Sequence, residues 1–142
     1  MSPHVMNEPA AILFVTGPHC IALRPADGSR LWTFECPHGE IVRFCRAAGR
    51  IYLLSSDMVV CLDASDGVVV GTAELEPGFG GGEALLGDDD RVLAATSRGV
   101  WALDHAGRIL WSAPAPASNL SGRAPFVGLA AGGQVQQPDY LD

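Results

Sequence analysis

The residues in this sequence best suited to chemistry are cysteines and histidines in its first third. Cys36 and His38 share one short stretch, Cys45 follows them, and His19 and Cys20 precede them. Thiolate and imidazole groups are ligands that tetrahedral zinc prefers, so these side chains could supply a soft-metal site. Their spacing matches no common zinc motif, and the cysteines lie in or beside apolar runs, where a free thiol packs as a small hydrophobic group. We therefore predict buried, reduced thiols and no bound metal.

Two further segments carry groups that could bind an ion or a phosphate. Asp88, Asp89 and Asp90 could offer oxygens to a hard cation, but consecutive aspartates also suit an exposed hairpin turn. The glycine-rich residues 78–82 lack the strand-to-helix context of a phosphate loop, and the sequence contains no Lys to reach a phosphate. We predict a polar turn and a connector at these places. No catalytic set converges, so we predict that the protein is not an enzyme.

Composition restricts the partners. The chain has 142 residues, of which 48% are hydrophobic and 18% charged, enough for a single domain with a core over residues 1–142. The net charge of −7 opposes binding to nucleic acid and to anionic membrane surfaces. Apolar runs such as residues 10–15 are far shorter than the roughly 18 residues that a membrane helix needs. The first residues lack the pattern of a secretory signal, so we expect a cytoplasmic protein.

A repeat of about 40 residues organises the chain. Three glycines lie 39 and 40 residues apart, each with a leucine four or five residues before it. Four residues after each glycine stands Trp, Gly or Trp. The matched sets are Leu23, Gly28 and Trp32; Leu62, Gly67 and Gly71; and Leu103, Gly107 and Trp111. Such self-similarity at a fixed period indicates a repeat architecture.

Each repeat resolves into short strands separated by tight turns. The units span about 11–36, 40–75 and 83–113, and the first is one strand short. The expected strands are 11–16, 20–24 and 30–35; then 40–46, 50–55, 58–63 and 68–74; then 83–86, 91–96, 99–104 and 108–113. Residues 125–130 are predicted to open a further unit, followed by a tail at 134–142.

A 40-residue period of four antiparallel strands is typical of a β-propeller blade, and blades must stack face to face to bury their surfaces. We therefore predict an all-β protein, a β-propeller of about three four-stranded blades. Propellers close with about 4 to 8 blades, so oligomerisation is expected to complete the ring. A dimer with six blades is favoured, in which the strand at 125–130 fills the incomplete first unit of its own chain or of its twin. A larger ring, a heteromeric ring and a fragment of a longer chain remain alternatives.

Residues 22–32 resemble the tryptophan-docking motif of the pyrroloquinoline-quinone-type propeller repeat. The third unit carries the motif with a turn one residue shorter, and the second has Gly71 at the tryptophan position. The resemblance implies that the motif tryptophan packs against the neighbouring blade and that the glycine lets the third strand turn into the fourth. The motif residues are Ala22, Gly28, Trp32, Asp63, Gly67, Ala102, Asp104, Gly107 and Trp111.

Resemblance to the repeat does not extend to the quinone enzymes. Those enzymes hold their cofactor beneath a disulfide between adjacent cysteines, with Glu, Asn and Asp on a calcium ion. Here no two cysteines are adjacent, and Asn7 and Asn119 are the only asparagines, both in expected loops. We therefore predict no cofactor and a non-catalytic scaffold that binds protein. The alternative is a propeller that binds a small molecule or metal, or a degenerate quinoprotein-like enzyme subunit.

The aromatic residues indicate where a partner could bind. We assign Phe14 and Tyr52 to packing within their strands, and Trp101 to packing between blades. Phe79 lies in the glycine-rich connector and Tyr140 in the polar tail, where their own strands cannot bury them. We predict that these two contact another copy of the chain or an unidentified protein.

Overall fold

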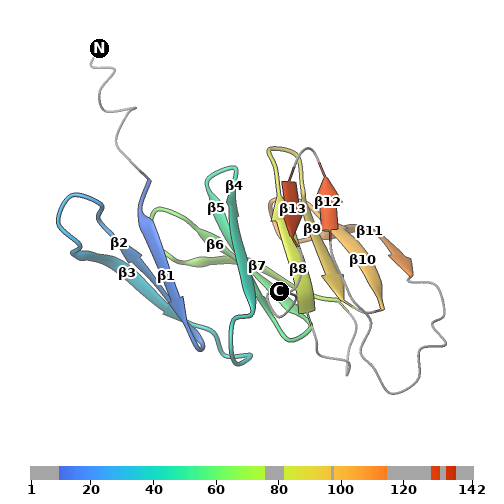
Figure 1. Cartoon of the computed structure of the whole chain (residues 1–142), viewed down its shortest axis with the longest axis horizontal. Helices are drawn as coiled ribbons and strands as arrows, with labels where there is room; N and C mark the ends of the chain where they lie inside the picture. The colour runs from blue at the N-terminus through green and yellow to red at the C-terminus, as the bar shows by residue number, and fades with distance from the viewer. Residues whose placement is uncertain (1–9, 76–81, 97, 115–128, 132–133, 137–142) are drawn as a thin grey trace, which may run out of the picture.

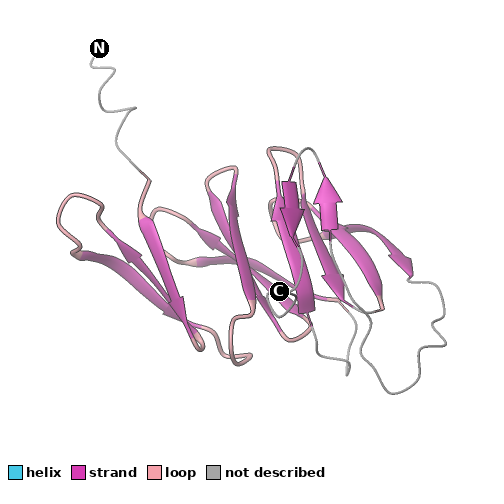
Figure 2. Ribbon diagram, in the orientation of Figure 1, coloured by secondary structure: helices cyan, strands magenta, loops and turns pink. Residues whose placement is uncertain are grey.

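The computed structural model describes residues 10–75, 82–96, 98–114, 129–131 and 134–136. Every regular element in these ranges is a β-strand, and none of the described residues is helical (Figure 2). Within them, accordingly, no helix could cross a lipid bilayer. The strands form antiparallel sheets of three, four and four strands, and a two-stranded hairpin. This confirms the all-β prediction.

The sheets follow chain order, and within each sheet successive strands of the chain pair with one another. Tight turns join the strands, as the repeat pattern predicted. The first sheet contains β1 (Ile12–Thr16), β2 (His19–Leu23) and β3 (Arg30–Glu35). The second contains β4 (Arg43–Ala47), β5 (Arg50–Ser55), β6 (Met58–Asp63) and β7 (Val69–Glu74). The third contains β8 (Gly82–Gly87), β9 (Val92–Thr96), β10 (Gly99–Leu103) and β11 (Ile109–Pro114), and the hairpin contains β12 (Leu129–Ala131) and β13 (Gln134–Gln136).

Two predicted strands differ from the structure. The strand expected at 40–46 is β4, which begins only at Arg43. The preceding residues connect the two sheets instead, because the Ile41 amide donates 2.9 Å to the Gly17 carbonyl of the first sheet. The strand expected at 125–130 is β12, which ends at Ala131, while residues 125–128 lie outside the described residues. Residues 134–136, expected as tail, pair with β12 as strand β13.

The three sheets stack side by side along the long axis of the molecule, with the second between the first and the third (Figure 1). The middle sheet buries both faces, so β5 and β6 are buried along nearly their whole lengths. On β5, Ile51 and Leu53 pack toward the first sheet, while Tyr52 and Leu54 pack toward the third. Strand β1 alternates instead between half-buried and exposed residues, because no sheet covers its outer face. Phe14 is on that face and is exposed, so assigning it to packing was wrong, whereas Tyr52 is buried.

Candidate functional site

The first sheet docks onto the second through the indole of Trp32. The ring packs against Gly67, where a Cβ atom would sit 2.6 Å from indole Cδ2. The Nε1–H group donates a hydrogen bond of 3.0 Å to the Ala64 carbonyl in the same turn. The side chain is consequently only 9% exposed. Gly67 has φ of +73°, so this turn needs glycine both for its left-handed backbone and for the space that the indole occupies.

At the equivalent position of the second sheet, Gly71 replaces tryptophan and the third sheet comes closer. Gly71 pairs with Cys61 across β6 and β7, as Trp32 pairs with Ala22 across β2 and β3. A Cβ atom at Gly71 would overlap the Ala106 carbonyl oxygen in the turn between β10 and β11. The second interface therefore has no room for a tryptophan at this position.

The third copy of the motif lies on β10 and β11 of the third sheet, whose inner strand β8 is contacted by the β12–β13 hairpin. Trp111 pairs with Ala102 on β10 and β11, the same place in the strand register as Trp32. Its side chain is 48% exposed, so it does not pack against a neighbouring blade as the resemblance implied. At the opposite end, Gly28 matches Gly67 in sequence and in φ, yet a Cβ atom there would meet nothing within 4 Å. Among the described residues, Trp111 thus has no turn to pack on, and the Gly28 turn has no tryptophan.

The motif aspartates shape the turns that carry these glycines. The Asp63 carboxylate accepts hydrogen bonds from the Ser65 amide at 2.8 Å and the Ser65 hydroxyl at 2.6 Å. The Asp104 carboxylate accepts from the amides of Ala106 and Arg108, each at 2.9 Å. These bonds favour the charged form and lower the pKa of Asp63 and Asp104 below the usual range. Both carboxylates therefore accept hydrogen bonds from, and stabilise, their own turns.

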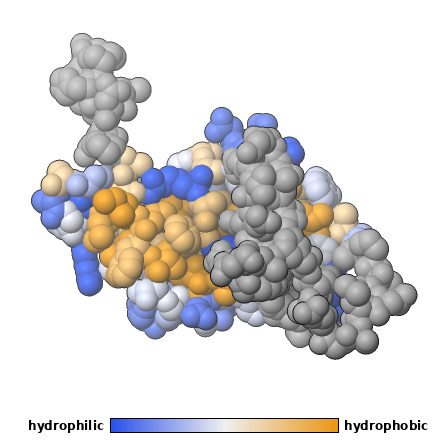
Figure 3. All heavy atoms as spheres, viewed as in Figure 1, coloured by the Kyte–Doolittle hydropathy of each residue, from blue (hydrophilic) through white to orange (hydrophobic). Residues whose placement is uncertain are grey.

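The inner side of the first sheet is open because that sheet has one strand fewer than the other two. In the part of the chain that the structure describes, β5 pairs with β4 and β6, and β9 pairs with β8 and β10, but β1 pairs only with β2. Strand β4 thus has no counterpart in the first sheet, and Val42 and Phe44 are 37% and 42% exposed. Phe44 pairs with Leu53, whose side chain packs in the core between the first two sheets. Apolar atoms gather on the surface over β1 and the adjacent strands of the second sheet (Figure 3).

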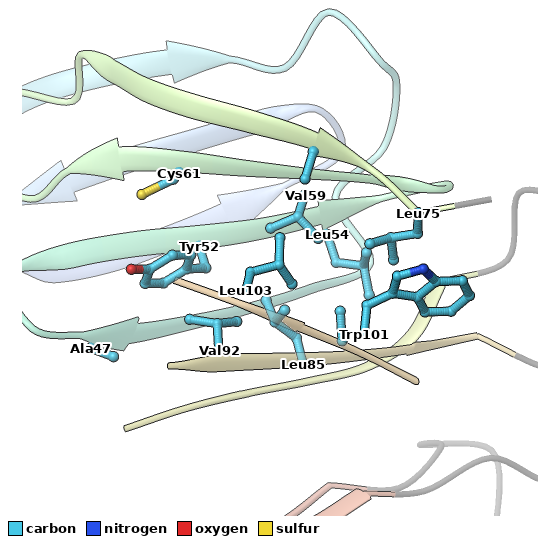
Figure 4. Packing of buried hydrophobic residues seen from close by; sticks show 12 residues of the cluster. Ala47, Tyr52, Leu54, Val59, Cys61, Leu75, Leu85, Val92, Trp101 and Leu103 are labelled. Carbon is cyan, nitrogen blue, oxygen red and sulfur yellow. The ribbon is translucent and has the colours of Figure 1, made fainter. Parts of the chain in front are cut away.

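The core between the second and third sheets includes a group of polar and thiol side chains beside its aliphatic residues (Figure 4). Tyr52 pairs with Cys45 on one side and Cys61 on the other, so all three lie on one face of the sheet. The Tyr52 hydroxyl hydrogen-bonds to Nδ1 of His105, which lies in the turn between β10 and β11. Burial raises the pKa of Cys45 to about 12, and burial also raises the pKa values of Cys61 and Tyr52. These groups stay protonated at neutral pH and connect the two sheets.

The cysteines considered as possible metal ligands are divided between the two hydrophobic cores. All four cysteines are free thiols, and Cys45 alone is not fully buried. Cys20 and Cys36 belong to the first core, and Cys45 packs against the second. Burial raises the pKa of Cys20 to about 11. In the described part of the chain, no three His, Cys, Asp or Glu residues group as metal ligands would.

The segment at Asp88–Asp90 is a turn, as the sequence predicted. The Asp88 carboxylate accepts hydrogen bonds from the amides of Asp90 at 2.8 Å and Arg91 at 2.9 Å. Its Oδ1 atom therefore accepts both bonds within the turn.

The predicted contact residues Phe79 and Tyr140 lie outside the described residues. Sequence reasoning left Phe44 unassigned and did not identify the open inner edge. The sequence did contain a signal for this open edge. The first repeat unit was one strand short, and the next strand, β4, carried the aromatic residue Phe44.

Stacked antiparallel sheets of three, four and four strands, joined through a repeated turn motif, define this chain as part of a β-propeller. The sequence profile of the family described as outer membrane protein assembly factor BamB matches residues 19–138, so the chain belongs to that family. The resemblance to pyrroloquinoline-quinone-type repeats is confirmed.

Two solved structures share the fold. BamB from Moraxella catarrhalis superposes with a TM-score of 0.69 and 18% identity, over 90% of this chain and 44% of that one. A europium-containing methanol dehydrogenase superposes with a TM-score of 0.61 and 18% identity, over 75% and 23% of the two chains. This chain therefore spans less than half the length of either protein. A search of curated proteins found no match.

Proposed function

We propose that this chain is a non-catalytic β-propeller module that associates with another copy of itself and recruits a protein partner. The name of its family, an assembly factor, supports an interaction role. The methanol dehydrogenase shares only the fold at 18% identity, which lends no activity to this chain.

The observation that carries the recruiting role is the open edge of β1. An edge strand presents unpaired N–H and C=O groups that can pair with an added strand. Phe44 on β4 and Val42 just before it lie on the face of the second sheet that is turned toward the first sheet. They are exposed because the described part of the first sheet has no strand opposite β4. The partner that fits is an extended segment that hydrogen-bonds to β1 and places an apolar side chain on Phe44.

A peptide-binding experiment tests the recruiting role. The intact chain is screened against displayed random peptides, and the dissociation constant of a selected peptide is measured for the parent and two variants. Phe44→Asp places a charge on the apolar surface and should raise the constant about tenfold or more. Val68→Asp is the control, because Val68 is equally apolar and 60% exposed in the turn before β7. Equal loss of binding in both variants, or no loss in either, would contradict the proposal.

A further inference from the structure

The second interface shows what an inner strand contributes to a pair of sheets. Strand β8, the inner strand of the third sheet, packs on β4, the inner strand of the second (Figure 1). Leu85 of β8 is fully buried in the core between these two sheets. A Cβ atom at Gly87 would lie 2.9 Å from Cβ of Ala47 and 3.2 Å from Sγ of Cys45. A residue at the Gly87 position therefore faces two alternate side chains of the inner strand before it.

Strand β4 carries, in the same register, two residues that would face an inner strand of the first sheet. Arg46 is equivalent to Gly87, because the strand partners of both residues pair in turn with the leucine that recurs in each repeat. Phe44 is equivalent to Leu85, since each lies two residues earlier on its strand. Both Phe44 and Arg46 are exposed, and the described part of the first sheet has no strand opposite them.

The open edge of β1 presents its backbone in the same register. Val15 corresponds to Leu54, whose carbonyl accepts a hydrogen bond of 2.8 Å from the Val42 amide beside it. Backbone groups of alternate residues point to opposite edges of a strand, so those of Leu13 and Val15 point away from β2. The side chains of Leu13 and Val15 pack against the core between the first two sheets. An added strand would therefore hydrogen-bond to these two residues and turn alternate side chains toward β4.

Arg46 places a positive charge at one end of this edge. Its guanidinium donates a hydrogen bond to the Ala11 carbonyl, the outward-facing acceptor that precedes Leu13 on the edge. A backbone N–H of an added strand would take over that carbonyl and leave the guanidinium beside the side chain opposite Ala11. A guanidinium forms its strongest hydrogen bonds with a carboxylate, because both groups are charged.

We infer that the segment recruited to β1 runs antiparallel to it and carries an acidic side chain two residues after an apolar one. The apolar side chain lies opposite Leu13 and covers Phe44, and the acidic side chain lies opposite Ala11 and pairs with Arg46. A second apolar residue, two positions earlier, lies opposite Val15. The order of Phe44 and Arg46 along β4 sets the order of the two kinds of side chain in the partner. This inference rests on the proposed recruiting role and specifies the chemistry of the recruited segment.

Binding of three synthetic peptides to the intact chain tests the inference by fluorescence polarisation. The first is acetylated, amidated Thr-Val-Thr-Val-Thr-Asp-Thr with a fluorescent label, the second has Asn in place of Asp, and the third has the first sequence in reverse order. The parent should bind the Asp peptide about threefold to fivefold more tightly than the Asn peptide, and this preference should shrink at high ionic strength. Arg46→Gln should bind the Asp and Asn peptides alike. The reversed peptide should bind the parent and Arg46→Gln with equal dissociation constants.

The control is Arg30→Gln, which removes the same charge from an exposed residue of β3, at the opposite edge of the first sheet. This variant should keep the preference of the parent, and circular dichroism should show equal strand content in all the proteins. Binding that Phe44→Asp weakens, but with equal affinity of the parent for the Asp and Asn peptides, would overturn the inference and leave the recruiting role intact. An unchanged preference in Arg46→Gln would do the same. Binding of no peptide, or binding that Phe44→Asp leaves unchanged, would overturn both.

Discussion

The two interfaces between sheets solve the same packing problem in different ways. In the first, Trp32 fills the space above Gly67, and a five-residue turn supplies the carbonyl that the indole needs. In the second, Gly71 and Gly107 let a shorter turn approach the backbone directly. The first interface also has no inner strand opposite β4, whereas Gly87 of β8 packs closely on Ala47 of β4 in the second.

The difference shows that the residue at the tryptophan position of one sheet matches the length of the turn that packs on it from the next sheet. A long turn leaves space that an indole fills, and a short turn requires glycine. It also shows that the second interface is complete within the chain, while the first leaves part of β4 exposed. Substitutions at equivalent residues of the two interfaces should therefore have unequal effects.

The largest loss of unfolding free energy is expected for substitutions of the leucine that recurs in each repeat. Leu62 and Leu103 are fully buried at the first and second interfaces, and Leu23 is only half-buried on the free outer face. Replacing Leu103 or Leu62 with Ala should lower the free energy of unfolding by about 3 kcal/mol. Leu23→Ala should cost about 1 kcal/mol in dilute protein, measured by urea unfolding. An equal cost at all three positions would remove the distinction between buried and free faces.

Gly71→Ala should cause the next largest loss of stability. The added methyl would overlap a backbone carbonyl of the third sheet, so we expect a loss of about 2 kcal/mol. Gly87→Ala is the matched change, because there the new methyl meets only side-chain atoms of Ala47, Cys45 and Val92. Thermal unfolding should show the smaller loss for Gly87→Ala. The reverse order would mean that the second interface is not held at Gly71.

A smaller difference in unfolding free energy is expected between substitutions of the two motif tryptophans. Trp32→Phe removes the hydrogen bond to the Ala64 carbonyl and should cost about 1 kcal/mol of unfolding free energy. Trp111→Phe should change the stability of dilute protein by less than about 0.5 kcal/mol, since the side chain is exposed. Chemical denaturation at low concentration measures both, and similar losses would show that Trp111 already packs within its own chain.

Much of this architecture could be predicted from the sequence, because the repeat signal is local. Glycines with positive φ and strands of alternating polarity identify the turns and sheets without knowledge of their neighbours. The role of Gly71 could not be predicted, since it depends on how closely the Ala106 carbonyl of another sheet approaches. Exposure of Phe44 was missed for the same reason: it follows from a strand that the adjacent sheet does not have.

Alkaline pH should affect the second interface through its buried thiols. Cys45 has its pKa raised by burial from near 9 to about 12, so the folded state keeps a proton that the unfolded state loses. The free energy of unfolding should thus be constant below about pH 9 and fall as pH rises toward 12. The sequence has no Lys, which leaves mainly Cys and Tyr side chains to titrate in that range. Cys45→Ala should make the fall shallower in urea unfolding at pH 8 to 11, and an unchanged slope would show that this thiol is solvated.

The most direct test of the account is the mass of the parent chain in solution, measured by light scattering over a wide range of protein concentration. The proposed function requires that one copy of the chain associates with another. It therefore predicts a mass that rises from 14.9 kDa toward a multiple of that value as concentration increases. A constant mass of 14.9 kDa at every concentration would contradict it.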